Sequence, residues 1–238
     1  MLENLKLENI LVLDIETVPA TEKFEKLDER WQKLWQHKAQ YLVVEGQTAE
    51  EIYNRAGIYA EFGKIVCISV GVFFRQSDSY HFKIKSFSGD DERVLLLEFC
   101  NLLNAGFSGA NKALCAHNGK EFDFPYLSRR MLVHGIKLPM LLNTAGRKPW
   151  EVNHIDTMQL WKFGDFKSYT SLDLLAATFN IPTPKDDIDG SMVWQVYYEE
   201  HDLERIKTYC QKDVVTLANV LLRFVGLPLL SQTELHFA

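Results

Sequence analysis

The run ILVLDIETVP, residues 10–19, constrains the fold of this chain more than any other segment. Its apolar beginning suits a buried strand, but two carboxylates, Asp14 and Glu16, interrupt it at a spacing of two. Side chains at that spacing point to the same face of a strand, where like charges repel and are costly to bury unpaired. Two interpretations stay open: a strand end where the acids are wet, or a cation between them, which requires further carboxylates elsewhere.

The composition bounds the class of protein. A chain of 238 residues, 47% apolar and 24% charged, can bury one sizeable core, so we expect a single domain over residues 1–238. No basic-then-apolar leader opens it and no apolar stretch reaches the roughly 18 residues of a membrane helix, which predicts a soluble, cytoplasmic protein. The four cysteines form no C-x-x-C pair and suggest buried, reduced thiols without a function: Cys67, Cys100, Cys115 and Cys210.

The charge is unevenly distributed along the chain. A net charge of −6 argues at first against a nucleic-acid partner, because phosphate binding draws on lysine and arginine. Residues 111–168, however, hold nine basic residues against five acids, a net +4, and leave −10 on the rest. This asymmetry is compatible with a local polyanion site on an acidic body, and chance clustering is the alternative.

The pattern of apolar residues predicts an α/β sandwich on a mixed sheet. Residues 20–62 predict a helical insertion with two helical stretches after the first strand, and residues 63–88 predict two strands joined as a hairpin. A helix capped by Asp90 or Asp91, a short strand at 113–118 and a helix ending at Gly135 follow. Two short helices and a long one from Asp202 to Gly226 complete the series. The sheet is expected to be mixed, because strands joined by a hairpin pair antiparallel and strands joined by a helical crossover pair parallel.

Two further acids lie where such a sheet gathers functional groups. Asp123 stands just past a turn, at the beginning of a helix, where it could equally be a helix cap. In the last helix, Tyr209 and Asp213 are one turn apart on one face, although Asp213 could be a solvated acid at the border of the core. Together with Asp14 and Glu16 these acids suit two divalent cations, Mg²⁺ or Mn²⁺, whose charge about four carboxylates offset.

Three segments carry a resemblance to a known family. LDIET at 13–17, HNGKEFDFPYL at 117–127 and YCQKD at 209–213 resemble the motifs of the DEDD superfamily of 3′–5′ exonucleases. The tyrosine four residues before the last aspartate indicates the tyrosine subgroup. The histidine subgroup would carry a histidine five residues before that aspartate, where this chain has Thr208. The segments at 61–71 and 185–199 resemble stand-alone exonucleases related to the proofreading domain of family B DNA polymerases.

The resemblance implies a fold and a reaction. The fold is ribonuclease H-like, a five-stranded mixed sheet in the order 3-2-1-4-5 with strand 2 antiparallel, and we place the fifth strand near residues 153–161. The implied enzyme is a metal-dependent phosphodiester hydrolase that degrades single-stranded DNA from the 3′ end to nucleoside 5′-monophosphates, in repair or editing. The same chemistry on RNA, or a catalytically silent nucleic-acid-binding module, are the alternatives.

The resemblance also assigns roles to residues. Metal ions would be held by Asp14, Glu16, Asp123 and Asp213, and Tyr209 would orient the attacking water or help to deprotonate it. The terminal nucleotide would be seated by Ile15, Thr17, Val18, Asn118 and Phe122. We expect His117 to satisfy a local hydrogen bond rather than bind metal, because hard cations prefer oxygen.

Some residues near the motifs keep two interpretations. Asp156 is either a helix cap or a group that supports the site. Arg129 and Arg130 are either phosphate contacts or ordinary solvated residues. The acids of KDDIDGS have turn residues as neighbours and are left out of the metal site.

The tail, about residues 227–238, carries a separate hypothesis. Its segment QTELHF, Gln232 to Phe237, loosely resembles the peptides that dock on bacterial sliding clamps. The sequence gives no indication of the oligomeric state.

Overall fold

The structure, a computed structural model, describes residues 5–165, 169–183 and 188–238. Lys167 of the basic segment and Asp186 and Asp187 of KDDIDGS lie outside the described residues. Among the described helices, none is long and apolar enough to cross a membrane.

A mixed sheet forms the centre of the molecule, with its strands in the order β5-β4-β1-β2-β3-β6. β2 runs antiparallel to both β1 and β3, whereas β4 is parallel to β1 and β5 is parallel to β4. This arrangement confirms the predicted fold class and the predicted order of the first five strands. The strands are β1 Ile10–Pro19, β2 Gly63–Gln76, β3 Ser79–Ser88, β4 Ala113–Ala116, β5 Ile155–Asp156 and β6 Leu235–Phe237.

The count of five strands was wrong, because the tail adds a sixth. After a 3₁₀ turn at Gln232–Glu234, β6 pairs in parallel with β3, and the Ala238 N–H donates to the carbonyl of Ile84 at 2.9 Å. A three-residue strand has too few positions to show an alternating pattern. Its pairing comes from the open edge of β3, which is tertiary information.

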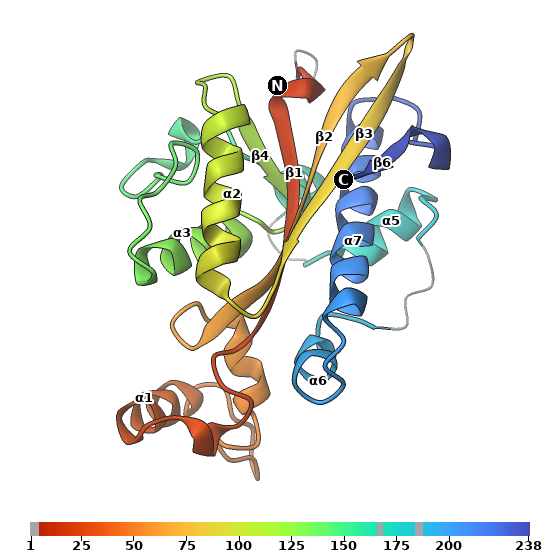
Figure 1. Cartoon of the computed structure of the whole chain (residues 1–238). Helices are drawn as coiled ribbons and strands as arrows, with labels where there is room; N and C mark the ends of the chain where they lie inside the picture. The colour runs from red at the N-terminus through yellow and green to blue at the C-terminus, as the bar shows by residue number, and fades with distance from the viewer. Residues whose placement is uncertain (1–4, 166–168, 184–187) are drawn as a thin grey trace.

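Helices cover both faces of the sheet (Figure 1). α2 and α3 lie on one face, and α5, α6 and α7 lie on the other. Side chains that accept hydrogen bonds from first-turn N–H groups fix several helix starts, among them the predicted caps Asp91 of α2 and Asp202 of α7. The helices of the sandwich are α2 Glu92–Gly106, α3 Asp123–Val133, α4 Thr157–Lys162, α5 Leu172–Thr178, α6 Val193–Tyr198 and α7 Leu203–Phe224.

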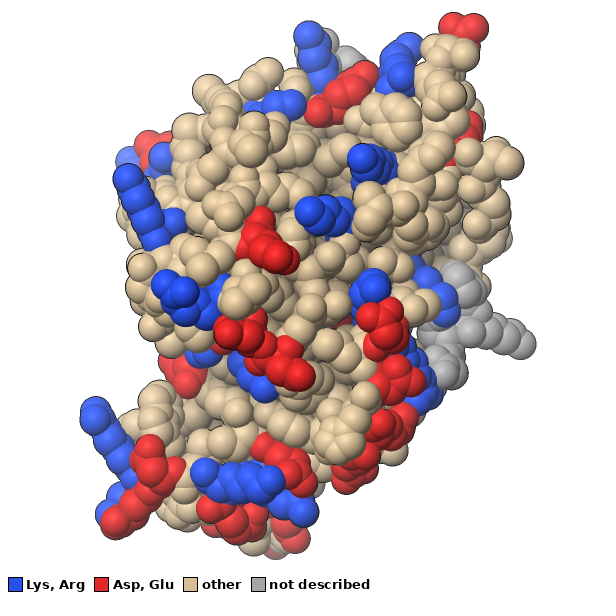
Figure 2. All heavy atoms as spheres, in the orientation of Figure 1, with Lys and Arg blue, Asp and Glu red and all other residues tan. Residues whose placement is uncertain are grey.

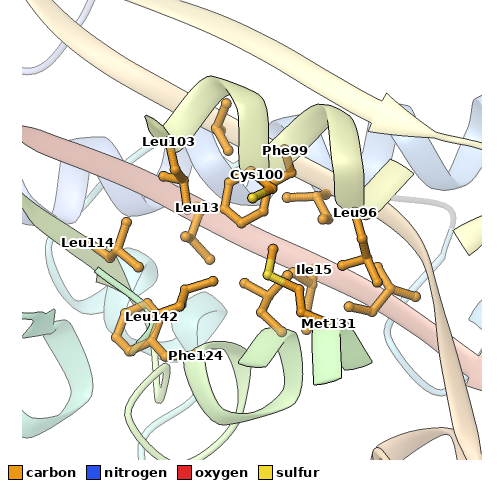
Figure 3. Packing of buried hydrophobic residues seen from close by; sticks show 14 of the residues in the cluster. Leu13, Ile15, Leu96, Phe99, Cys100, Leu103, Leu114, Phe124, Met131 and Leu142 are labelled. Atoms are coloured by element: carbon orange, nitrogen blue, oxygen red, sulfur yellow. The ribbon is translucent and has the colours of Figure 1, made fainter. Parts of the chain in front are cut away.

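β1 is buried on both faces, and its alternation decides which residues face which layer. Leu13 and Ile15 pack with α2 and α3, as Figure 3 shows. Ile10 and Val12 pack on the other face against α7. Because side chains alternate along a strand, Asp14 follows Val12 on the α7 face.

The insertion between β1 and β2 forms a small cluster of its own. α1, Glu29–Ala39, is capped by Asp28 and contributes the buried Trp35. The predicted second helix is wrong: residues Tyr53–Ile58 form a 3₁₀ helix instead. Gly57 explains the tight path, because a Cβ there would lie 3.0 Å from the backbone of Val18. The first predicted helical stretch also begins later than its apolar spacing suggested, with Phe24–Lys26 in a separate 3₁₀ turn.

Candidate active site

Asp14 and Glu16 lie on the part of β1 that extends past the end of β4. β4 pairs with β1 only as far as Val12 and Cys115, so Asp14 and Glu16 have no backbone partner on β4. Glu16 is 7% exposed and Asp14 is half-buried. Burial raises the pKa of Glu16 well above its usual range, and the charge of Asp14 raises it further.

α7 brings three polar side chains to the same place. Cys210 is fully buried, and its thiol lies 3.4 Å from both the carbonyl oxygen and Oδ2 of Asp14. Burial raises the pKa of Tyr209 far above its usual value, and the charges of Asp213 and Glu16 act in the same direction. The phenol therefore stays protonated at any physiological pH.

The charge of Asp213 also reaches the acids of β1. Burial raises the pKa of Asp14 well above its usual range, followed by the charges of Asp123 and then Asp213. The structure thus brings the four predicted acids and Tyr209 together from three segments of the chain.

Asp123 is the first residue of α3 and is 3% exposed. It is not the helix cap that the sequence allowed, because α3 begins after Phe122 with no side-chain cap. Its Oδ1 is buried and has no hydrogen-bond partner among the described residues. Burial raises the pKa of Asp123 to about 7, although backbone N–H groups, including that of Ile15, offset part of the rise. An acceptor buried in this way costs free energy unless a donor or a cation meets it.

The turn between β4 and α3 is held by Asp156. Its Oδ1 accepts from the N–H of Asn118 at 3.0 Å, and its Oδ2 accepts from the N–H of Lys120 at 3.1 Å. Asp156 also caps α4 by accepting from the N–H of Met158 at 3.0 Å, so its interpretation as a helix cap is confirmed, and its support of the metal site stays a prediction.

Asn118 and His117 differ in how well their side chains are satisfied. Asn118 has a left-handed backbone with φ of 62°, and its Oδ1 is buried without a hydrogen-bond partner among the described residues. His117 lies 2.9 Å from the hydroxyl of Thr157 through Nδ1 and 2.7 Å from the carbonyl of Thr170 through Nε2. These contacts confirm the predicted local role of His117, whereas Oδ1 of Asn118 is left without a partner among the described residues.

Two of the predicted nucleotide contacts have side chains inside the core. Ile15 is 4% exposed and packs under α2, and Val18 is 0% exposed. Neither side chain can reach a nucleotide, so a contact at these positions would use backbone atoms. Thr17 and Phe122 are half-buried, and the Phe122 ring lies 5.3 Å from that of Tyr126.

Arg130 has a structural partner and is not the solvated residue or phosphate contact that the sequence suggested. Its Nε and Nη2 donate to the two oxygens of Glu92 at 2.9 and 2.6 Å, and it is 9% exposed. Arg129, the neighbouring residue, is exposed and keeps both interpretations.

Cys210 is the residue at this site that the sequence missed. Ligand atoms of Asp14, Glu16 and Cys210 all lie within 4.8 Å of one another. The only available signal was its position next to Tyr209 in YCQKD, because nothing in the local sequence shows that its thiol points at Asp14.

The side chains fit divalent cations. Buried carboxylates that raise one another's pKa are destabilising as they stand, and Oδ1 of Asp123 lacks a partner among the described residues. Oxygen ligands of this kind suit Mg²⁺ or Mn²⁺, which would offset the repulsion and satisfy the oxygen.

Comparisons with known proteins identify related molecules. A family model described as a predicted 3′–5′ exonuclease related to the exonuclease domain of PolB matches residues 58–232, which include Asp123, Tyr209 and Asp213. No curated protein matches this sequence. The structure is similar to the family B DNA polymerase from the hyperthermophilic archaeon Pyrobaculum calidifontis, with 17% identity and a TM-score of 0.54. The match covers 91% of this chain and 24% of the polymerase, so the chain spans about a quarter of that protein.

The RNase domain of the yeast Pop2 protein is more distant. It shares 12% identity with this chain at a TM-score of 0.44, over 92% of this chain and 78% of that domain.

Proposed function

Because the chain belongs to the family of predicted 3′–5′ exonucleases related to the exonuclease domain of PolB, we propose that it shortens single-stranded DNA from the 3′ end with two divalent metal ions. The family membership confirms the predicted enzyme class, a metal-dependent 3′–5′ exonuclease. The observation that supports the finer proposal is the meeting of Asp14, Glu16, Asp123, Asp213 and Tyr209 beyond the end of β4.

The four carboxylates would hold the metal ions. Asp14, Glu16 and Asp213 would hold one ion, and Asp123 with Asp14 would hold a second; the charges of Asp123 and Asp213 both act on Asp14. Ions bound there lower the pKa of a coordinated water and stabilise charge on the phosphate oxygens.

Tyr209 would orient the attacking water rather than deprotonate it. Burial and then the charge of Asp213 raise its pKa far above the usual value, and its hydroxyl donates to the Asp213 carboxylate, so the phenol oxygen is left to accept from the water. Cys210 would fix the rotamer of Asp14 through its contact with Oδ2. Both residues belong to α7, so the packing of one helix would set the positions of the water and of a metal ligand.

Asn118 and Phe122 would receive the terminal nucleotide. The amide oxygen of Asn118 could accept a hydrogen bond from a nucleotide, and the half-buried ring of Phe122 offers an apolar surface. The scissile phosphate would have to approach Glu16, which is 7% exposed, so the end of the nucleic-acid strand would have to be free of its complement to reach it. This requirement supports a single-stranded substrate.

A degradation assay tests the proposal. Single-stranded DNA labelled at its 5′ end, and RNA of the same sequence, are incubated with Mg²⁺ or Mn²⁺ and then with a chelator. We expect a ladder of 3′-shortened DNA that needs metal, nucleoside 5′-monophosphate as the product, and no cleavage by Asp213→Ala. Preferential cleavage of the RNA would make the protein an exoribonuclease, and intact substrates with measurable binding would make it a silent binding module.

Tyr209→Phe provides a graded comparison in the same assay. Loss of one positioning hydrogen bond is expected to slow cleavage by about 10²-fold and to leave a residual rate. A complete loss, equal to that of Asp213→Ala, would mean that Tyr209 does more than position the water.

The tail keeps its proposed role as a peptide that docks on a sliding clamp. Gln232, Leu235 and Phe237 line a cavity of about 600 Å³ against α7, so docking would require β6 to separate from β3. A pull-down with a sliding clamp, using the chain with and without residues 232–238, tests this role. Equal retention of both forms would dismiss it.

A further inference from the structure

Cys210 lies among the carboxylates, which is an unusual place for a sulfur atom. Of the four cysteines, Cys100 lies in α2 with its thiol 3.7 Å from the carbonyl of Lys137, and Cys115 packs in the core beside α7. Cys67, on β2, packs in the same cluster as Cys210, and its thiol lies 3.8 Å from the hydroxyl of Ser69. Cys210 instead has its thiol within 4.8 Å of a ligand oxygen of both Asp14 and Glu16. A hard cation such as Mg²⁺ does not take sulfur as a ligand, because it prefers oxygen.

The distances suit a softer cation. The sulfur lies 3.4 Å from Oδ2 of Asp14. With bonds of about 2.1 Å from oxygen and about 2.3 Å from sulfur to zinc, that separation corresponds to an angle of about 100° at the metal, near the tetrahedral value. The sulfur and the oxygen could therefore share one ion with little movement of either residue.

A second observation points to a cation at the same place. Oδ1 of Asp123 is buried, lacks a hydrogen-bond partner among the described residues, and belongs to the carboxylate whose charge acts most strongly on Asp14 after burial. A site that gathers a thiol and carboxylates offers the mixed sulfur and oxygen donor set that Zn²⁺ and Cd²⁺ accept.

We propose that Asp14, Glu16 and Cys210 form a site for thiophilic divalent cations, Zn²⁺ or Cd²⁺, which blocks the exonuclease by occupying the position of the catalytic metal. The blocking rests on the proposed function, whereas the binding does not. When the ion binds, the Cys210 thiol releases its proton to solvent and the sulfur forms one bond to the metal, with no change of oxidation state. The bound Zn²⁺ or Cd²⁺ is held by sulfur as well as by oxygen, so excess Mg²⁺ displaces it slowly.

Cadmium binding gives a readout that does not depend on activity. The wild-type chain, Cys210→Ser and Cys100→Ser are titrated with Cd²⁺ in thiol-free buffer, and the sulfur-to-cadmium charge-transfer absorption is recorded in the ultraviolet. We expect one ion per chain with this absorption for the wild type and for Cys100→Ser. Cys210→Ser is expected to lose the absorption. Its affinity for Cd²⁺ is expected to fall by about tenfold or more, as removal of a metal-site contact does.

A measurement on the unaltered chain covers the case in which Cys210→Ser fails to fold. The ¹¹³Cd chemical shift distinguishes a sulfur ligand from a site of oxygen ligands alone. An oxygen-only shift, or an absorption that persists unchanged in folded Cys210→Ser, would overturn the proposal.

Inhibition is then measured separately, as Zn²⁺ added to the Mg²⁺-supported cleavage of DNA, with each variant compared with its own uninhibited rate. Binding with sulfur ligation but no cleavage by any form of the chain would refute the proposed function and leave the metal site standing. Cleavage of DNA without sulfur ligation of the ion would support the proposed function and refute the metal site.

Discussion

At the scale of single residues, the carboxylates of the candidate site repel one another, and bound metal ions would relieve that repulsion. Asp14 and Glu16 share one face of a buried strand. The charge of Asp14 raises the pKa of Glu16, and the charges of Asp123 and Asp213 raise the pKa of Asp14. Asp14→Asn keeps the shape and the acceptor oxygen that faces Cys210 but removes one charge. Without metal we expect this variant to be more stable by about 1 kcal/mol, or about 2–4 °C in Tm for a chain of this size, and to have no hydrolytic activity.

Thermal unfolding in a chelator and the DNA assay in Mg²⁺ measure the two effects. Glu121→Gln, which removes an exposed charge next to the site's turn, is the control and should change neither quantity. Asp14→Asn that is less stable than the wild type in the chelator would show that the carboxylate is satisfied by the protein alone.

The raised pKa of Asp123 makes stability depend on pH with a definite sign. Its pKa is about 7 in the folded chain and near its ordinary value, about 4, in the unfolded chain. Between these values the folded state binds more protons, so the stability of the metal-free chain falls as pH rises from about 4 to about 7. Asp14 and Glu16, whose pKa values are also raised, act in the same direction.

Melting curves across this range, with chelator and with Mg²⁺, test the sign. Mg²⁺ binds the ionised carboxylates, so its stabilising effect should grow as pH rises. Asp123→Asn should flatten part of the slope seen in the chelator. Stability that rises with pH in the chelator would contradict the pKa direction.

The sequence predicted these residues better than their surroundings. Asp14, Glu16 and Asp213 lie within motifs whose spacing determines which face of their strand or helix they occupy, and the family resemblance implied that they share one site. The thiol of Cys210 and the unpartnered oxygen of Asp123 depend on how α7 and α3 approach β1, which no local pattern encodes. For the same reason the sequence left Arg130 with two surface interpretations when its partner, Glu92, is 38 residues away.

At the scale of elements, the ion pair of Glu92 and Arg130 positions α3. Glu92 accepts from Arg130, from the N–H of Ile65 at 2.8 Å and from His134, so one carboxylate joins α2, α3 and β2. Burial acts to raise the pKa of Glu92, but the hydrogen bond from Arg130 and the other donors bring it below its usual value. Asp123 begins the helix that this pair holds in place.

Removing one partner of this pair should be costly. Arg130→Met leaves Glu92 buried without its counter-charge, and breaking a buried pair in this way costs about 3–5 kcal/mol. Chemical denaturation measures the loss, and Arg129→Met, at the exposed neighbouring position, should change stability little. Equal effects of the two variants would mean that the pair is not a determinant of stability.

The elements themselves were predictable where their patterns are long. β1, β2, β3, α2 and α7 each provide enough positions for alternation or helical spacing to show, and Asp156 marked the start of α4 as a cap. β6 and the 3₁₀ helix at Tyr53–Ile58 are short, and each exists because of a neighbour: the edge of β3 in one case and the end of β1 beneath Gly57 in the other.

At the scale of the whole molecule, an acidic chain must bring a polyanion to an acidic site. Figure 2 shows acidic side chains gathered around α6 and the beginning of α7, where Glu199, Glu200, Asp202 and Glu204 are exposed. Of the nine basic residues in segment 111–168, Arg130 is neutralised by Glu92. The remaining positive charge includes Lys120, in the turn that carries Asn118 and leads to Asp123.

Lys120→Glu should therefore weaken the binding of single-stranded DNA, because a positive charge near the site that would attract phosphate is replaced by a negative charge that repels it. Each lost contact to a single strand reduces the slope of log affinity against log salt by about 0.7. Fluorescence anisotropy across a salt series in Ca²⁺, which limits cleavage, measures that slope. Lys33→Glu makes the same charge change on α1, outside the basic segment, and should leave the slope as it is. If both variants weaken binding equally, the affinity for single-stranded DNA depends on the net charge of the chain alone, and residues 111–168 do not form a local binding site.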